Sequence, residues 1–341
     1  MKTLILCLPL IFILAKTQAQ ENNVGFSILF YNTENLFDTR NDSLTNDDEY
    51  TPSGDRHWTR KRFAEKINHL SKVIVSANGW EMPDIIGLCE VENRYVLERL
   101  IDDTPIKSTP YKIIHKESPD MRGIDVALLY NAETFYPLDY ACYPLKDEHD
   151  NIRATREILH VFGVVNGADT LHIFVNHWPS RYSGLLETRY LREQAAQLLL
   201  SKYNEVIQKN NRANVIIVGD FNDQPNDNSI ETYLGAKSAS NLSASVQLYN
   251  LSYDWMKEAE GTLKYQNQWF VFDQIMVSPN LLTARTGLRT TMEMSAIYKP
   301  SFLFEPDKTH GGRKLNRTYI GFKYNGGFSD HLPVLLQIRQ D

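Results

Sequence analysis

Apolar runs of strand length recur along the whole chain and are separated by polar segments. In NVIIVGDFN, mostly β-branched residues lead to a glycine and then to an aspartate and an asparagine, which is typical of a buried strand ending in a turn. Several runs are almost continuously apolar, which indicates burial on both faces. Asn166-Gly167 favours a tight hairpin between two runs. The predicted strands are 24–32, 84–91, 111–116, 124–131, 157–165, 169–178, 214–222, 272–278 and 332–338.

Three segments show helical periodicity instead: 59–76, 93–102 and 187–209. The first carries an apolar stripe at the spacing i, i+4, i+7, i+11, formed by Phe63, Ile67, Leu70 and Ile74. Many strands accompanied by few helices predict two packed sheets flanked by helices. We expect residues 20–341 to form a single domain.

Residues 1–19 have the pattern of a signal peptide. A positive start at Lys2 is followed by the apolar run LILCLPLIFIL and by a small residue at position 19. We therefore predict an exported protein, periplasmic or extracellular. No later segment reaches the roughly 18 apolar residues that a membrane span needs, so we expect none.

Charge and cysteine content narrow the function classes. Loss of Lys2 and Lys16 with residues 1–19 takes the formal net charge from −6 to −8. An acidic protein lacks the overall basic surface of a nonspecific DNA binder, so it needs a local positive patch, a cation or a small substrate. Cys89 and Cys142 could pair after export, but two thiols form no disulfide framework, and a buried free thiol is favoured for Cys89.

Three polar loops, 38–57, 223–268 and 305–328, exceed ordinary connection lengths, which often marks functional loops. The first is acidic; a solvated surface loop is favoured over calcium binding, because its spacing fits no standard calcium loop. The basic segment HGGRKLNR at 310–317 is the best local candidate for a polyanion contact, although a solvated loop is favoured there too.

Polar residues stand at the ends of six predicted strands that are far apart in the sequence. Each one alone is explained as a cap or turn residue. Together they predict a cation site, because converging carboxylates repel one another unless a cation intervenes. Oxygen ligands without a Cys or His cluster suit Mg²⁺, with Mn²⁺ or Ca²⁺ as alternatives. These residues are Asn32, Glu90, His177, Asp220, Asn222, Asp273, Asp330 and His331.

The motifs FYNTENLFD, GLCEVEN, NHWPSR, GDFND, FDQIMVS and SDHLPV occur in the order seen in the endonuclease/exonuclease/phosphatase superfamily, which this chain resembles from about residue 24 to 339. Its members include deoxyribonuclease I, abasic-site endonucleases, sphingomyelinases and inositol-polyphosphate 5-phosphatases. The resemblance implies a four-layer α-β-β-α sandwich, two mixed β-sheets flanked by helices, with all six motifs at one rim.

The resemblance also implies roles at the metal and at the attacking water. Glu90 resembles the principal metal carboxylate, with Asn32 and Asp330 close to the ion. Asp220 resembles the residue that orients or deprotonates the water. Glu92 either contacts this group or is an acid in the first turn of a helix.

Other residues would hold the phosphate. Asn222 would donate to it, and a two-residue strand offset from Asp220 would point both side chains the same way. His331 resembles the imidazole that contacts the scissile phosphate, with Asp273 fixing its tautomer. His177 matches a second phosphate-facing histidine. Arg156 resembles a phosphate-binding arginine, with Arg153 nearby.

Five neighbouring residues also need an interpretation. Trp178 and Arg181 are candidates to shape the substrate site, and Trp178 is equally well interpreted as a packed residue at the rim. Arg189 and Arg192 in the long helix are expected to be surface or ion-pairing groups. Asp223 is expected to be only a turn residue.

We therefore expect a metal-dependent phosphoesterase, with nuclease action on DNA or RNA first. A phosphatase or a phospholipid or sphingomyelin phosphodiesterase is the alternative. Gln274 argues against the inositol phosphatases of this superfamily, which tend to have a Cys-Asp-Arg motif there. The sequence has no long apolar hairpin that would suit a membrane-bound substrate. An inactive binding module is disfavoured, because each catalytic position has the expected residue type. The expected partner is a phosphodiester substrate, and we expect a monomer.

Overall fold

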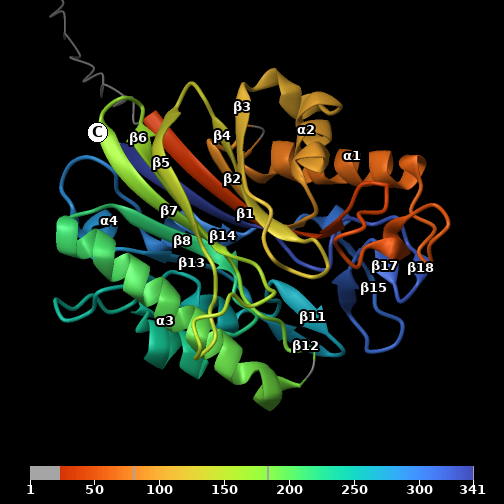
Figure 1. Cartoon of the computed structure of the whole chain (residues 1–341). Coiled ribbons are helices and arrows are strands. Elements are labelled where there is room, and N and C mark those ends of the chain that lie inside the picture. Colours follow the sequence, from red (N-terminus) through yellow and green to blue (C-terminus); the bar gives the residue numbers. More distant parts are fainter. Residues whose placement is uncertain (1–23, 80, 183, 341) are drawn as a thin grey trace, which may run out of the picture.

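Two mixed β-sheets lie face to face, with helices on their outer faces (Figure 1). This computed structural model describes residues 24–79, 81–182 and 184–340, so the predicted signal peptide at 1–19 lies outside the described residues. The arrangement is the predicted four-layer α-β-β-α sandwich. A parallel pair lies at the centre of each sheet, β1 (Val24–Leu36) with β2 (Ile85–Val91) and β7 (Asp169–His177) with β8 (Val215–Asp220). The short edge pair of the second sheet, Lys237–Ser238 with Tyr249–Asn250, is also parallel, and the other pairs are antiparallel.

The first sheet has six strands in the order β14-β19-β1-β2-β4-β3. In that order they are Ser295–Ile297, Val334–Gln340, Val24–Leu36, Ile85–Val91, Asp125–Asn131 and Tyr111–His115. Helices α1 (Arg60–Ala77) and α2 (Arg94–Asp102) cover its outer face (Figure 1). The hydroxyl of Thr59 caps α1 by accepting from the Arg62 backbone N–H, and the predicted apolar stripe of α1 is buried.

The second sheet has seven strands in the order β5-β6-β7-β8-β13-β10-β9. In that order they are Phe135–Tyr143, Ile158–Val165, Asp169–His177, Val215–Asp220, Asp273–Val277, Tyr249–Asn250 and Lys237–Ser238. Helix α3 (Leu185–Lys209) packs Ala195, Leu199 and Tyr203 onto this sheet. The short helix α4 (Pro279–Thr283) follows β13.

Strand β5 was not predicted from the sequence. It is an edge strand that contains Pro137, and its side chains are mostly exposed or half-buried, so it lacks a continuous apolar pattern.

The three long loops contain short elements, and in the first of them a 3-10 turn lies at Asp48–Tyr50. A π-helical turn lies at Ser229–Leu234. Three small hairpins pair Leu263–Tyr265 (β11) with Gln268–Phe270 (β12), Phe304–Pro306 (β15) with Arg313–Leu315 (β16), and Tyr319–Ile320 (β17) with Lys323–Tyr324 (β18).

The hairpin predicted at Asn166-Gly167 and the buried position predicted for Cys89 are confirmed. Asn166 and Gly167 both have positive φ, 47° and 73°, in the tight turn between β6 and β7. Gly87 lies where the two sheets meet closely: a Cβ there would stand 3.4 Å from Val218 and 3.5 Å from Val175 of the opposite sheet. Cys89 is buried, and both Cys89 and Cys142 are free thiols.

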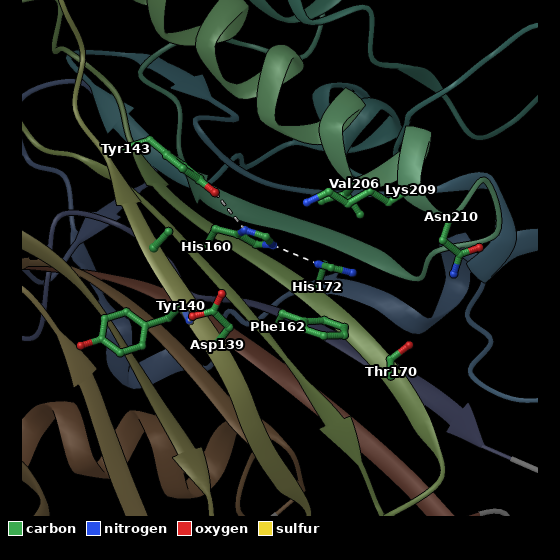
Figure 2. Close-up of a pocket in the computed structure, with 11 residues that line it drawn as sticks. Asp139, Tyr140, Tyr143, His160, Phe162, Thr170, His172, Val206, Lys209 and Asn210 are labelled. Atoms are coloured by element: carbon green, nitrogen blue, oxygen red, sulfur yellow. Dashed lines mark hydrogen bonds between the residues drawn. The ribbon is translucent and has the colours of Figure 1, made fainter.

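A cavity of about 350 Å³ lies on the outer face of the second sheet, beside the end of α3. Figure 2 shows Tyr143, His160 and His172 in a row on the sheet side, with Val206 and Lys209 opposite. His160 Nε2 lies 3.0 Å from His172 Nδ1. Burial lowers the pKa of His160 to about 3 and that of His172 to about 4, so both rings are neutral at pH 7.

This histidine pair makes the fold acid-sensitive. Because the folded chain keeps both rings neutral, the unfolded chain binds more protons below about pH 6.5. The contribution to stability is complete above that pH and is lost as the pH falls toward 4, with a slope of up to about 1.4 kcal/mol per pH unit for each ring. We expect His172→Phe to reduce the pH dependence of the unfolding free energy between pH 6.5 and 4, measured by urea unfolding.

The matched control is His149→Gln, since His149 is exposed and should leave the slope unchanged. An identical slope in wild type and His172→Phe would contradict the neutral buried pair.

Candidate active site

The central parallel strands of the two sheets end at the same rim and bring the predicted residues together. Asn32 lies on β1 and Glu90 on β2, while His177 ends β7 and Asp220 ends β8. Parallel neighbours necessarily present their ends at the same edge.

Asp220 is the hub of this group. It is 2% exposed, and its Oδ2 accepts a hydrogen bond from Asn32 Nδ2 at 3.0 Å, across the space between the sheets. The same oxygen lies 3.8 Å from His177 Nε2 and 3.7 Å from His331 Nε2. Burial raises the pKa of Asp220 to about 6, although His331 and two hydrogen bonds oppose the shift.

His331 and Asp273 form a buried pair beside this hub. His331 Nδ1 lies 2.7 Å from Asp273 Oδ2, and the remaining oxygen, Oδ1, is buried without a hydrogen-bond partner among the described residues. Burial lowers the pKa of His331, but Asp273, Asp220 and Asp330 outweigh it and hold that pKa well above its ordinary value. His331 is therefore an imidazolium whose Nε2 faces Asp220.

Glu90 owes its position to a β-bulge. The register of β2 shifts between Cys89 and Val91 against both neighbouring strands, and Glu90 itself has φ +60°, a left-handed conformation that is strained for this residue type. Its Oε2 accepts from the Asn35 backbone N–H at 3.0 Å, and Oε1 lies 3.8 Å from His177 Nε2. Burial and the nearby charge of Asp330 raise the pKa of Glu90.

Asp330 belongs to a charge network that the sequence analysis missed. Glu34, which has φ +51°, is buried and accepts from Arg317 Nε at 2.9 Å and from the Thr318 backbone N–H at 2.6 Å. Arg317 Nη2 also donates to Asp330 at 2.8 Å. Lys66 of α1 is 1% exposed, and burial lowers its pKa to about 8. The motif NTEN contained the only signal for Glu34.

His177 is held neutral by its surroundings. Burial first, and then the charges of Arg156 and Arg122, lower its pKa well below the ordinary value. Its Nδ1 is buried and has no hydrogen-bond partner among the described residues. Arg156 is itself buried, and its guanidinium donates to Asp120 at 2.9 Å and to the Trp178 carbonyl at 2.7 Å.

Asn222 reaches the site differently from the prediction. Strand β8 ends at Asp220, and Asn222 has φ +51°, so no two-residue strand offset aligns the two side chains. Instead the Asn222 backbone N–H donates to Asp220 Oδ1 at 2.9 Å, and its side-chain Nδ2 donates to the Trp178 carbonyl at 3.1 Å. The turn therefore fixes the Asp220 carboxylate.

Of the two expectations for Arg192, a surface position or an ion pair, the ion pair is confirmed. Arg192 is fully buried, with Nε 2.8 Å from Asp223 Oδ1. Asp223 also binds Arg181 Nη2 at 2.6 Å and accepts from the Ser229 hydroxyl at 2.6 Å. Asp223 is thus more than a turn residue, since it ties α3 to the loop that follows Asp220. Arg189 is half-exposed and pairs with Glu193.

Other neighbouring residues have structural positions. Trp178 is buried against Phe221. Glu92 accepts from the Asp38 backbone N–H and so fixes the acidic loop; burial raises the pKa of Glu92 to about 8. In the basic segment, Arg313 pairs with Glu260 and Lys314 with Glu305.

The donor set at the rim fits a hard divalent cation. Glu90 and Asp330 are like charges with partly exposed side chains, and Glu90 bears the raised pKa that a cation would reverse. Asp220, Asp273 and His331 form a second group, whose ligand atoms lie within 4.8 Å of one another. Its His331 Nδ1 and Asp273 Oδ2 bind each other, whereas Glu90 Oε1 accepts no hydrogen bond from the described residues and lies 3.8 Å from His177 Nε2. The group around Glu90 therefore suits the cation better.

The model of the Endonuclease/Exonuclease/phosphatase family matches residues 27–340. This chain belongs to that family. Humanized D. rerio TDP2 has a similar structure, with a TM-score of 0.56 and 14% identity over 92% of this chain and 98% of that one. A Bacteroides thetaiotaomicron endonuclease/exonuclease/phosphatase family protein gives 0.56 and 15% over 94% and 99%. The human Nocturnin catalytic domain gives 0.52 and 16% over 92% and 94%.

No curated protein matches the chain by sequence. The structural neighbours, at these identities, establish the deoxyribonuclease I-like fold alone. Within the described residues, no helix has the length and apolar character needed to cross a membrane.

The buried pair of Arg192 and Asp223 gives a stability prediction. Arg192→Ala should lower the unfolding free energy by about 3 kcal/mol, because it leaves part of a buried carboxylate uncompensated. Arg189→Ala, on the same helix but half-exposed, should change it by less than about 0.5 kcal/mol. Equal effects of the two substitutions in urea unfolding would show that the buried pair does not stabilise this turn.

Proposed function

We propose that this chain is a metal-dependent phosphodiesterase that acts as a nuclease. The observation that carries the proposal is the position of the Asp220 carboxylate, hydrogen-bonded to Asn32 and within 4 Å of both His177 and His331. A carboxylate between a neutral and a charged imidazole is placed to take part in proton transfer beside a phosphate.

Asn32, Glu90 and Asp330 would hold the cation, Mg²⁺ first, with Mn²⁺ or Ca²⁺ as alternatives. When bound, the cation would offset negative charge on the phosphoryl oxygens. Glu90 is suited to this by its bulge, which turns its carboxylate to the rim at the end of a buried strand.

Asp220 would accept a proton from the attacking water. Its pKa of about 6 lies near neutral pH, where a general base works best, and two hydrogen bonds fix its orientation. His331, kept as an imidazolium by Asp273, would donate through Nε2 to the phosphate and stabilise the charge that develops there.

Neutral His177 and the arginine behind it would serve the other side of the phosphate. His177 has its ring between Glu90 and Asp220 and can donate to a phosphoryl or leaving oxygen. Arg156 adds positive charge behind His177 and donates to the carbonyl of the next residue, Trp178. The Asn222 side-chain amide donates to the same carbonyl and so lies at the same side of the site.

Nucleic acid is the substrate class we favour. One of the similar structures is D. rerio TDP2 in complex with a single-strand DNA product. Gln274 is fully buried, donates to the Asp223 carbonyl and accepts from Asn250, so it is part of the core and gives no support to an inositol phosphatase. The test below has two other outcomes: phosphatase or phospholipid phosphodiesterase activity, or no activity, as expected of a binding module. We also propose export, on the pattern of residues 1–19.

The test is an activity panel with the protein beginning at residue 20. With Mg²⁺, we expect hydrolysis of plasmid DNA, RNA or bis-p-nitrophenyl phosphate, and little of a phosphomonoester or sphingomyelin. A chelator should abolish it, and Glu90→Ala and His331→Ala should each lower kcat at least about 100-fold, because each removes a group that stabilises the transition state.

Glu133→Ala and His149→Ala, both at exposed positions, are the matched controls and should retain wild-type rates. Equal rates in wild type, Glu90→Ala and His331→Ala would refute the mechanism. Absence of turnover on every phosphoester by the folded protein would favour the binding module.

A further inference from the structure

A cavity of about 450 Å³ adjoins the candidate active site. Four segments form it: 120–122 before β4, 153–156 before β6, 179–182 after β7, and the first turns of α3. The Trp178 carbonyl joins it to the site, because Arg156 in the cavity wall and Asn222 in the site both donate to that oxygen.

The cavity wall is positive although the chain is acidic. Three arginines line it, Arg122, Arg153 and Arg156, against the single carboxylate of Asp120. Asp120 lies 2.9 Å from Arg156 and 3.3 Å from Arg122, so its charge is already shared. An excess of arginine in a hollow beside a phosphodiester site is suited to a second phosphate group.

Two tyrosines stand at the same cavity with exposed rings. Tyr182 is 96% exposed and Tyr190 is 50% exposed. The guanidinium of Arg153 lies 5.7 Å from the centre of the Tyr190 ring. Rings left this open to water beside cationic groups are the arrangement on which proteins stack unpaired bases.

We propose that this cavity binds the nucleotide next to the scissile phosphate, with its phosphate on Arg122 and Arg153 and its base stacked on Tyr190. This inference rests on the proposed nuclease function and sharpens it. Bases in a duplex already stack on their neighbours, so the cavity selects single-stranded nucleic acid or an unpaired end.

The test compares a substrate that fills the cavity with one that does not. Bis-p-nitrophenyl phosphate has neither a base nor a second phosphate. A single-stranded oligonucleotide of about eight nucleotides covers one such site. For Arg153→Ala and Tyr190→Ala, we expect KM for the oligonucleotide to rise about 10-fold with kcat little changed, whereas kcat/KM for bis-p-nitrophenyl phosphate stays within about 2-fold of wild type.

Two variants serve as matched controls. Tyr190→Phe keeps the ring and should behave as wild type. Arg189→Ala removes a positive charge from the neighbouring position, whose side chain pairs with Glu193 and does not line the cavity, and should leave KM unchanged.

Three outcomes would overturn the inference: equal losses on both substrates, no change on either, or the same rise in KM with Arg189→Ala. If the wild type hydrolyses no phosphodiester, the proposed function fails, and the cavity is then tested by fluorescence anisotropy with a labelled oligonucleotide in chelator. There, an increase in Kd of about 10-fold with Tyr190→Ala supports the cavity, and an unchanged Kd refutes it.

Discussion

The hydrogen bond from the Asn32 amide to the Asp220 carboxylate joins the two sheets at the rim where all the candidate chemistry lies. One partner comes from the central strand of the first sheet and the other from the central strand of the second. Both side chains are almost fully buried. The site therefore exists only where the two sheets meet, and the close contact of the sheets at Gly87 is part of what holds it together.

This arrangement concentrates buried and partly buried charge in one place. Glu34, Glu90, Asp220, Asp273 and Asp330 gather within one rim, and the protein compensates them with Lys66, Arg317 and the imidazolium of His331. Compensation is uneven. Glu34 and Asp330 share an arginine, while Glu90 accepts one backbone hydrogen bond and lies among further carboxylates. That imbalance locates the place where a divalent cation would contribute most.

Much of this could be predicted from the sequence, because the strands are long apolar runs and the rim residues stand at their ends. The hairpin at Asn166-Gly167 and the stripe of α1 are local patterns, and both are confirmed. The contacts that could not be predicted join residues that are far apart in the sequence. Glu34 meets Arg317 across 283 positions, and Arg192 meets Asp223 from a helix whose polar residues all look like surface residues in a single sequence. Asn222 was misplaced for a different reason. Strand alternation would align its side chain with that of Asp220, but its positive φ turns the side chain another way.

Glu90, Asp330 and Asn32 are the residues that we propose to hold a divalent cation. Calorimetric titration of Mg²⁺ into the wild type and into Glu90→Gln, which removes the charge but keeps the shape, tests this proposal most directly. We expect one saturable binding event in the wild type and its loss in Glu90→Gln, with both proteins folded. Equal Mg²⁺ binding by the two, or none by the folded wild type, would contradict it.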